Sequence, residues 1–322
     1  MRAAGVRELG GDIQLLDLPD PRTPGAGEVL IEVRAAGVGN WDEYVRTGGW
    51  DTGTRPPMAL GVEASGVVVA TGPGGGEFTV GDRVITHSLP LRGQGAWAEY
   101  LLAAAADTAL LPQGTGWAAA AALPVPALTA SQALRAAGVA TGQTVLVHGA
   151  GGVTGGLLVQ LAARAGAEVI ATGSPAGAAR IAALGARDVI DYHDLAWPEQ
   201  VRSLTAGGGV DAALNAARDG AAAALRAVRP GGALATITGD PPQAGRGIGV
   251  TSVVVTPDGR RLGGLARLLA DGMIGLAAEA QFPLDEGAAA LARVRAGTHG
   301  TAVVIKPAGQ VDALEHVDAL EN

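Results

Sequence analysis

The stretch QTVLVHGAGGVTGG, Gln143–Gly156, decides the fold of this chain. It begins with a run of apolar and β-branched residues, Thr144–Val147, which leads into closely spaced glycines. An amphipathic helix pattern follows, and a second apolar run occupies Glu168–Thr172. The order of strand, glycine turn, helix and strand predicts a βαβ unit with a crossover helix.

The glycines of this turn indicate a dinucleotide site. They let the backbone pass close to a pyrophosphate, and the N–H groups and dipole at the start of the following helix bind its negative charge. The spacing differs from the commoner G-x-G-x-x-G, and a chain with 51 glycines matches such patterns by chance, so a purely structural turn is the alternative. We favour the dinucleotide site, whose expected residues are Gly149, Gly151, Gly152, Val153 and Gly155.

Composition excludes several classes of site. The 322 residues are enough for two domains, and none is cysteine, which excludes disulfides, thiolate zinc sites and a cysteine nucleophile. The formal net charge of −8 argues against broad nucleic-acid binding. The longest apolar run, Trp117–Leu128, is interrupted by two prolines and is too short for a membrane span. With no basic and apolar leader at the N-terminus, we expect a soluble cytoplasmic protein.

The patterning divides the chain into two expected domains. Residues 1–121 are rich in turn signals and alternate in EVLIEVR (Glu28–Arg34), which predicts a folded antiparallel sheet. Strand and helix patterns alternate over residues 122–257, which predicts a doubly wound parallel sheet. Residues 258–322 contain one clear strand, Thr301–Ile305, which we expect to rejoin the N-terminal part. The expected domains are therefore a β-rich substrate domain, 1–121 with 258–322, and a Rossmann cofactor domain, 122–257.

The alternating part predicts individual elements. The expected strands are Thr144–His148, Glu168–Thr172, Asp188–Ile190, Val210–Leu214, Ala233–Ile237 and Gly249–Val255. The expected helices between them are Val153–Ala165, Pro175–Leu184, Pro198–Leu204 and Asp219–Val228. At the end of the chain VDAL occurs twice within residues 309–322, which we interpret as a loosely held appendage.

Seven motifs carry a resemblance to a known family. They are GVGNWDEYVRTGGW (Gly37–Trp50), PPMALGVEASGVVVATG (Pro56–Gly72), VGDRV (Val80–Val84), GAWAEYLL (Gly95–Leu102), LPVPALTASQAL (Leu123–Leu134), VLVHGAGGVTG (Val145–Gly155) and LGARDVIDY (Leu184–Tyr192). Over about residues 1–307 the chain resembles the zinc-free quinone oxidoreductase branch of the medium-chain dehydrogenase/reductase superfamily. The resemblance implies an α/β fold, with a Rossmann doubly wound parallel sheet and a GroES-like, partly open β-barrel substrate domain. It also implies an active site in the cleft between them.

The resemblance bears on metal binding. Zinc-binding members of the superfamily carry cysteine and histidine ligands at places that hold Gly39 and Val62 here, and the five histidines of this chain are scattered. No metal site is therefore expected. Glu63 is present without its metal, and we consider two roles for it. It is either polar support beneath the cleft or a buried structural carboxylate paired with an arginine.

The resemblance implies NADPH-dependent, zinc-independent hydride transfer to a quinone or similar conjugated carbonyl acceptor. An enoyl or alkenal (C=C) reductase that tailors secondary metabolites is the second reading, and a low-turnover NADPH-binding sensor or scaffold is the third. Relatives usually carry Asn and Tyr where this chain has Gly39 and Trp50, so the usual proton donor is missing. The remaining catalytic candidates are Asn40, Tyr44 and Trp50, although Tyr44 and Trp50 are also explained by packing.

The end of the second strand of the βαβ unit predicts the cofactor. Sites that prefer NAD place an acid there to hold the ribose 2′-OH, but here the strand ends in Gly173 and Ser174. Ser174 can donate a hydrogen bond to a 2′-phosphate and Arg180 can supply charge, although a solvated helix arginine is the alternative for Arg180. We therefore expect NADPH as the cofactor.

Further cofactor contacts are implied by the resemblance alone. They are Thr129 near the nicotinamide, Tyr192 near the adenosine phosphate, Asn215, Thr238 and Gly239 along the cleft, and Val254 near the carboxamide. The expected partner is a small-molecule quinone or enone, with no nucleic acid and no membrane. The resemblance also implies a homodimer, for which Thr251–Thr256 could supply the edge strand.

Overall fold

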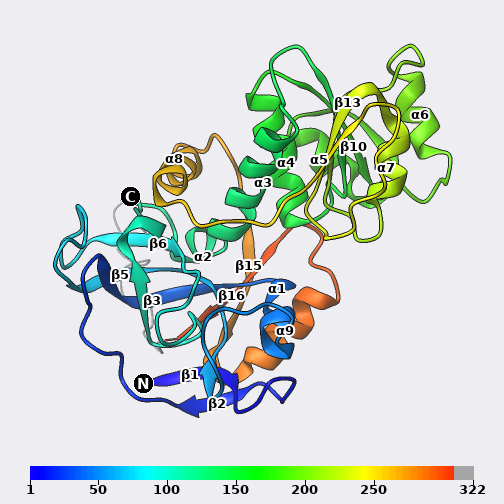
Figure 1. The fold of residues 1–322 in the computed structure, drawn as a ribbon. Helices are drawn as coiled ribbons and strands as arrows, with labels where there is room; N and C mark the ends of the chain where they lie inside the picture. Colours follow the sequence, from blue (N-terminus) through cyan, green and yellow to red (C-terminus); the bar gives the residue numbers. More distant parts are fainter. Residues whose placement is uncertain (308–322) are drawn as a thin grey trace, which may run out of the picture.

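The computed structural model describes residues 1–307, and Figure 1 shows them as two lobes, each built around its own β-sheet. The expected appendage at 309–322 lies outside the described residues. None of the helices within 1–307 is long and apolar enough to cross a membrane.

One lobe contains a six-stranded sheet in the order β11-β10-β9-β12-β13-β14, with every neighbouring pair parallel. Its strands are β9 (Thr144–His148), β10 (Glu168–Gly173), β11 (Ala186–Asp191), β12 (Val210–Asn215), β13 (Val228–Thr236) and β14 (Gly249–Ser252). Numbered along the chain, the spatial order is 3-2-1-4-5-6, the arrangement of doubly wound nucleotide-binding sheets. The predicted parallel sheet is confirmed.

Helices cover both faces of this sheet because its strands are apolar on both sides. Val145 and Val147 of β9 belong to the apolar cluster that includes α3 and α4 on one face, while Leu146 between them belongs to the cluster with α6 and α7 on the other. The helices of the lobe are α3 (Pro124–Ala136), α4 (Val153–Arg164), α5 (Ala178–Ala183), α6 (Trp197–Ser203) and α7 (Ala221–Ala227), with the 3₁₀ turn η2 (Pro175–Gly177) before α5.

The other lobe contains a seven-stranded sheet that mixes early and late parts of the chain. Its path is β15-β16-β3-β5-β6-β8, with β7 paired to β3. The late strand β16 pairs antiparallel with β3, and β15 pairs parallel with β16. The strands are β3 (Glu28–Val38), β5 (Glu63–Thr71), β6 (Arg83–His87), β7 (Tyr100–Ala104), β8 (Thr108–Leu110), β15 (Ala278–Pro283) and β16 (Ala302–Lys306). The assignment of residues to two domains stays a prediction.

Smaller elements complete this lobe. A three-stranded sheet has the order β2-β1-β4, and helices lie around it and along the junction (Figure 1). These elements are β1 (Arg2–Val6), β2 (Gln14–Asp17), β4 (Met58–Ala59), α1 (Trp41–Thr47), α2 (Trp117–Ala121), α8 (Gly259–Ala270), α9 (Gly287–Arg295) and the 3₁₀ turns η1 (Ala105–Asp107) and η3 (Leu284–Glu286).

The structure differs from the predicted elements in several places. The strand expected over Ala233–Ile237 begins five residues earlier, at Val228, where the expected helix Asp219–Val228 has already ended. The strand expected over 249–255 ends at Ser252, because the side-chain amide of Gln132 of α3 binds the Thr256 backbone. Its Nε2 donates to the Thr256 oxygen at 2.7 Å, and its Oε1 accepts the Thr256 N–H at 3.1 Å. The sequence analysis also missed β15 and α9. The alanine-rich stretch of α9 has no clear helical period, and β15 is ordered by pairing with β16. The dimer predicted through Thr251–Thr256 stays a prediction, and β14 is an edge strand of its sheet.

Candidate functional site

The turn between β9 and α4 is closed by two glycines. Gly149 has a φ of +90°, and its N–H donates to Thr172 Oγ1 at 3.1 Å. A Cβ on Gly155 would stand 2.1 Å from the Gly149 oxygen, so the first turn of α4 lies directly on the loop. Glycine is therefore required at 149 by the backbone angle and at 155 by the close approach.

The opposite side of the same loop is open. A Cβ on Gly151 would meet no atom within 4 Å, and one on Gly152 would meet the Gly149 oxygen at 3.9 Å. Gly152 directly precedes α4, and no side chain caps this helix. The first N–H groups of α4, from Val153 onward, lie at the positive end of the helix dipole, where they can bind an anion. The five glycine-loop residues of the sequence analysis thus form one local site that fits a pyrophosphate.

The end of β10 lies beside this loop. Ile181 of α5 packs so closely on Gly173 that a Cβ there would be 2.3 Å from its Cδ1. Ser174 follows and is half-buried. Asp191 stands opposite Gly173 on β11, and its carboxylate accepts from the His193 ring at 2.6 Å. The tip of β10 itself therefore presents a hydroxyl and no acid.

Two other cofactor candidates flank this end of the sheet. Tyr192 is 44% exposed, and its ring packs against His193 with centroids 4.2 Å apart. Arg180 of α5 is half-buried, and its Nη2 donates to the Gly151 oxygen at 2.8 Å. The guanidinium thus reaches the glycine loop, while its contact with a 2′-phosphate stays a prediction.

Asn215 ends β12 and is fully buried. Its side-chain amide donates to the Thr236 and Thr238 hydroxyls at 3.0 and 2.9 Å, and both hydroxyls also donate to Asp240. Gly239 lies within this turn with a φ of +75°. In this structure Asn215 therefore holds together the turns after β12 and β13, and cofactor contacts of this group stay predictions.

His148 belongs to the same edge but was missed by the sequence analysis. Its Nδ1 lies 2.7 Å from Thr172 Oγ1, and its ring stacks on Trp197 with centroids 4.5 Å apart. Burial lowers the pKa of His148 to about 4, partly opposed by the charge of Asp240, so the ring is neutral at pH 7. Its place at the carboxyl end of β9, directly before the glycines, was a usable signal.

Two further cofactor candidates implied by the resemblance are Thr129 and Val254. Thr129 of α3 is nearly buried, and its hydroxyl donates to the Val125 oxygen at 2.7 Å. Val254 is 74% exposed in the connection from β14 to α8. Their cofactor contacts stay predictions.

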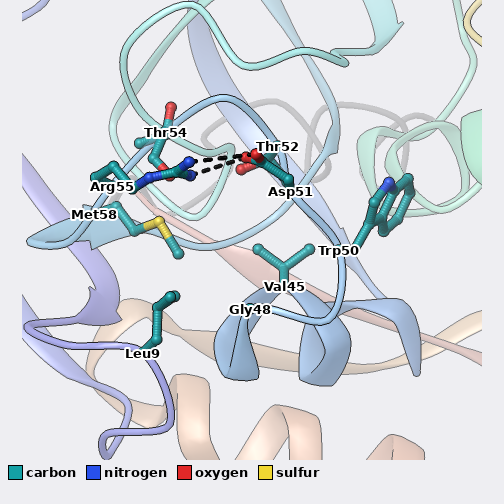
Figure 2. A pocket seen from close by; sticks show the side chains of 9 residues that line it. All are labelled: Leu9, Val45, Gly48, Trp50, Asp51, Thr52, Thr54, Arg55 and Met58. Carbon is teal, nitrogen blue, oxygen red and sulfur yellow. Dashed lines mark hydrogen bonds and ion pairs between the residues drawn. The ribbon is translucent and has the colours of Figure 1, made fainter.

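The three catalytic candidates lie on one continuous segment around α1. Asn40 is exposed directly before the helix, and Tyr44 is 51% exposed. The backbone N–H of Trp50 donates to the backbone oxygen of Tyr44 at 3.1 Å. A pocket of about 250 Å³ lies beside this segment, and Figure 2 shows Trp50 at its edge with the indole directed away from Leu9 and Met58. Their catalytic roles stay predictions.

Gly39, where relatives usually carry asparagine, is covered by its neighbour Trp41. A Cβ on Gly39 would stand 2.2 Å from Trp41 Cζ2, so any side chain there would displace the indole. The Trp41 Nε1 is buried without a hydrogen-bond partner among the described residues. Where relatives usually have an asparagine side chain at position 39, the Trp41 indole thus fills the space here.

Asp42 of α1 is a buried acid within the motif Gly37–Trp50. Its Oδ2 accepts the Gly39 N–H at 2.8 Å, and the Gly61 N–H bonds to the same carboxyl group. Its Oδ1 has no partner within residues 1–307. Burial raises the pKa of Asp42 to about 7, although the two backbone donors oppose the shift.

Glu63 lies near Asp42 and is a buried carboxylate, but it lacks the arginine partner that one of the two expectations gave it. It is buried, and its Oε2 accepts the Val125 N–H at the start of α3 at 2.7 Å. No arginine pairs with it in the described part of the chain, so the expected arginine pairing is wrong. Burial raises the pKa of Glu63 well above its ordinary value, and the nearby Asp42 raises it further. Gly37 makes room for this carboxyl, since a Cβ there would be 2.3 Å from Oε1.

His87 stands directly opposite Glu63 in the β5–β6 pair, an arrangement that places Cβ atoms about 5 Å apart on one face. It is fully buried, and neither ring nitrogen has a partner among residues 1–307. Burial lowers the pKa of His87 to about 4. Burial therefore keeps the His87 ring uncharged at neutral pH and favours the protonated form of Glu63.

A metal centre was not expected, and the positions concerned are occupied by Gly39 and a buried Val62. In the part of the chain that the structure describes, no group of three His, Cys, Asp or Glu side chains is placed to hold a metal ion.

Comparisons with known proteins agree with this architecture. Residues 25–113 match the alcohol dehydrogenase GroES-like domain, and residues 184–305 match a family described as zinc-binding dehydrogenase. A solved mycobacterial quinone oxidoreductase is 32% identical with a TM-score of 0.81, covering 95% of this chain and all of that one. A mycobacterial protein solved in complex with NADPH is also 32% identical, with a TM-score of 0.82 and the same coverage.

Two further relatives are a quinone oxidoreductase and a much longer synthase. Human quinone oxidoreductase is 33% identical over 216 residues, which are 66% of this chain and 64% of that protein. Erythronolide synthase EryA2 from Saccharopolyspora erythraea is 40% identical over 202 residues, which are 61% of this chain but 5% of the synthase. The chain thus spans less than two thirds of the length of either relative.

Asp42 generates a prediction about pH. The folded protein keeps a proton on Asp42 up to about pH 7, whereas the unfolded carboxyl, with a pKa of 3.8, has released it. The contribution of Asp42 to the free energy of unfolding is therefore largest below pH 3.8 and is lost as pH rises through 7. Relative to wild type, Asp42→Asn should change this dependence by about 2 kcal/mol between pH 5 and pH 8 in urea unfolding.

The comparison with wild type is needed because His87 and His148 act in the opposite direction, adding stability as pH rises from about 4 to 6.5. Asp17→Asn on the exposed face of β2 is the matched control and should leave the pH dependence unchanged. Parallel stability curves for Asp42→Asn and wild type would contradict the burial of a protonated Asp42.

The two sides of the glycine loop generate a second prediction. Gly151→Ala should leave the melting temperature close to wild type, because its Cβ meets open space, but should abolish dinucleotide binding by obstructing the pyrophosphate. Gly155→Ala should instead destabilise the fold by more than about 1 kcal/mol, because its Cβ overlaps the Gly149 oxygen. Calorimetric titration with NADPH and thermal unfolding measure both effects. If Gly151→Ala bound NADPH with wild-type affinity, the glycine loop would not be the dinucleotide site.

Proposed function

The chain belongs to the quinone oxidoreductase branch of the medium-chain dehydrogenase/reductase superfamily, and we propose that it transfers hydride from NADPH to a quinone or similar conjugated carbonyl acceptor without zinc. The observation that carries the proposal is the glycine loop. It is open over Gly151 and Gly152 and uncapped at α4, and it lies where the strand order of a doubly wound sheet reverses.

The proposal of NADPH over NADH rests on the end of β10. Ser174 stands where an acid would otherwise hold the ribose 2′-OH and repel a 2′-phosphate. A hydroxyl at this place can donate to the phosphate. The mycobacterial relative that was solved with NADPH supports the same choice.

NADPH would supply the hydride, and the protein would supply binding, orientation and a proton. The glycine loop and the first N–H groups of α4 hold the pyrophosphate end. On the facing lobe, Tyr44 is the exposed candidate for giving a proton to the reduced acceptor, while Asn40 and Trp50 border the same segment. Asp42 and Glu63 are enclosed beneath this wall, where they support it without reaching solvent.

The second candidate is an enoyl or alkenal reductase in secondary metabolism. The observation that favours it is the 40% identity to a segment of erythronolide synthase, together with 35% identity over 219 residues to a mycocerosic acid synthase-like polyketide synthase. Both reactions deliver hydride to a conjugated carbonyl system, so the same cofactor geometry serves either acceptor. A low-turnover NADPH-binding sensor or scaffold is the remaining alternative.

An acceptor panel tests the reaction. Steady-state NADPH oxidation should be fastest with flat quinones, and rates with enones and enoyl thioesters should be lower. Faster turnover of enoyl thioesters would support the reductase of secondary metabolism instead. If the protein binds NADPH but oxidises it no faster than background with any acceptor, the sensor or scaffold is the remaining function.

The cofactor preference has its own test. Ser174→Asp should weaken NADPH binding by about tenfold or more while sparing NADH, because a carboxylate repels the 2′-phosphate and accepts from the 2′-OH. Ser203→Asp on the exposed face of α6 adds the same charge to the same lobe and is the control. Dissociation constants for both cofactors decide the matter. An unchanged preference in Ser174→Asp would mean that the end of β10 does not contact the ribose.

A further inference from the structure

Arg180 occupies an unusual place for a helix arginine. It projects from α5 to the glycine loop, where its Nη2 donates to the Gly151 oxygen at 2.8 Å. A guanidinium has five N–H donors, and this is the single hydrogen bond of Arg180 within residues 1–307. No acidic side chain in that part of the chain forms an ion pair with it. Most of its hydrogen-bonding capacity is therefore unused.

The guanidinium also touches the other lobe. A Cβ on Gly300 would stand 2.4 Å from Arg180 Cζ and 2.5 Å from both terminal nitrogens, so the flat group lies against the Gly300 backbone. Gly300 belongs to the connection between α9 and β16, and β16 is a strand of the seven-stranded sheet. Arg180 thus joins α5, the glycine loop and the opposite lobe at one point.

The electrostatics of this point favour an anion. The N-terminus of α4 carries a positive partial charge from the helix dipole, and no side chain caps it. The Arg180 guanidinium places a full positive charge at the same loop. Two unneutralised positive groups at the glycine loop repel each other, and an anion bound to both would offset that repulsion.

We propose that Arg180 binds the pyrophosphate that NADH and NADPH share, and does not read the 2′-phosphate that distinguishes them. The proposal rests on the proposed function, since it assumes a dinucleotide on the glycine loop. It reassigns Arg180 from a determinant of cofactor choice to a clamp on the common part of the cofactor. Through Gly300 the clamp also ties the bound dinucleotide to the lobe that faces it.

The test compares both cofactors in matched variants. Arg180→Ala should raise the dissociation constants of NADPH and NADH together, by about tenfold or more, with their ratio unchanged within about twofold. Arg180→Gln, which keeps much of the length without the charge, should do the same. Arg164→Ala removes one arginine from the exposed far end of α4, about 18 Å away along the helix, and should change neither constant.

Each other outcome overturns the proposal. A loss confined to NADPH would assign Arg180 to the 2′-phosphate, and unchanged binding of both cofactors would remove it from the site. Thermal unfolding of Arg180→Gln shows that the comparison is made on folded protein. Failure of the wild-type chain to bind either cofactor would instead refute the proposed function, and the two failures are therefore distinguishable.

Discussion

The lobe with the six-stranded parallel sheet depends on one close approach, between Gly155 in the first turn of α4 and the carbonyl oxygen of Gly149. No side chain separates them, since a single Cβ would stand 2.1 Å from that oxygen. The contact fixes how α4 leaves the sheet and therefore where its N–H groups lie. The space above Gly151 is open. The same turn is therefore tightly packed at Gly155 and leaves the backbone at Gly151 accessible to a ligand.

In the facing lobe, too, glycines allow close packing, but there the space that they leave is filled by neighbouring side chains. Gly37 and Gly39 lack side chains, and the neighbouring Glu63 carboxyl and Trp41 indole fill the space that they leave. Filling it with a carboxyl far from solvent has an electrostatic cost, which the structure meets by raising the pKa of Glu63 and keeping His87 neutral. The wall behind the catalytic candidates is therefore compact, burial favours the uncharged forms of its titratable groups, and no cation is paired to Glu63 within residues 1–307.

Local sequence patterns predicted the parts whose causes are local. The strand, glycine turn and helix of the βαβ unit follow from apolar periodicity and from glycine, and the alternation over 122–257 correctly predicted the parallel sheet. Patterns failed where order comes from distant partners. β15 forms by pairing with β16, and the end of β14 is set by Gln132, which is more than 100 residues away in the chain. The burial of Asp42 was equally invisible, because its enclosure depends on Gly61 and the sheet around it.

By itself the sequence determined the fold class, the glycine loop and the absence of an acid at the end of β10, because each of these depends on residues adjacent in the chain. Only the tertiary structure decided which groups share the loop. Arg180 lies 29 residues beyond Gly151 in the chain, yet its guanidinium bonds to that residue and lies on Gly300 of the other lobe. Charge on a helix shows in a sequence, but the direction of a long side chain is set by the packing of segments that meet only in the folded protein.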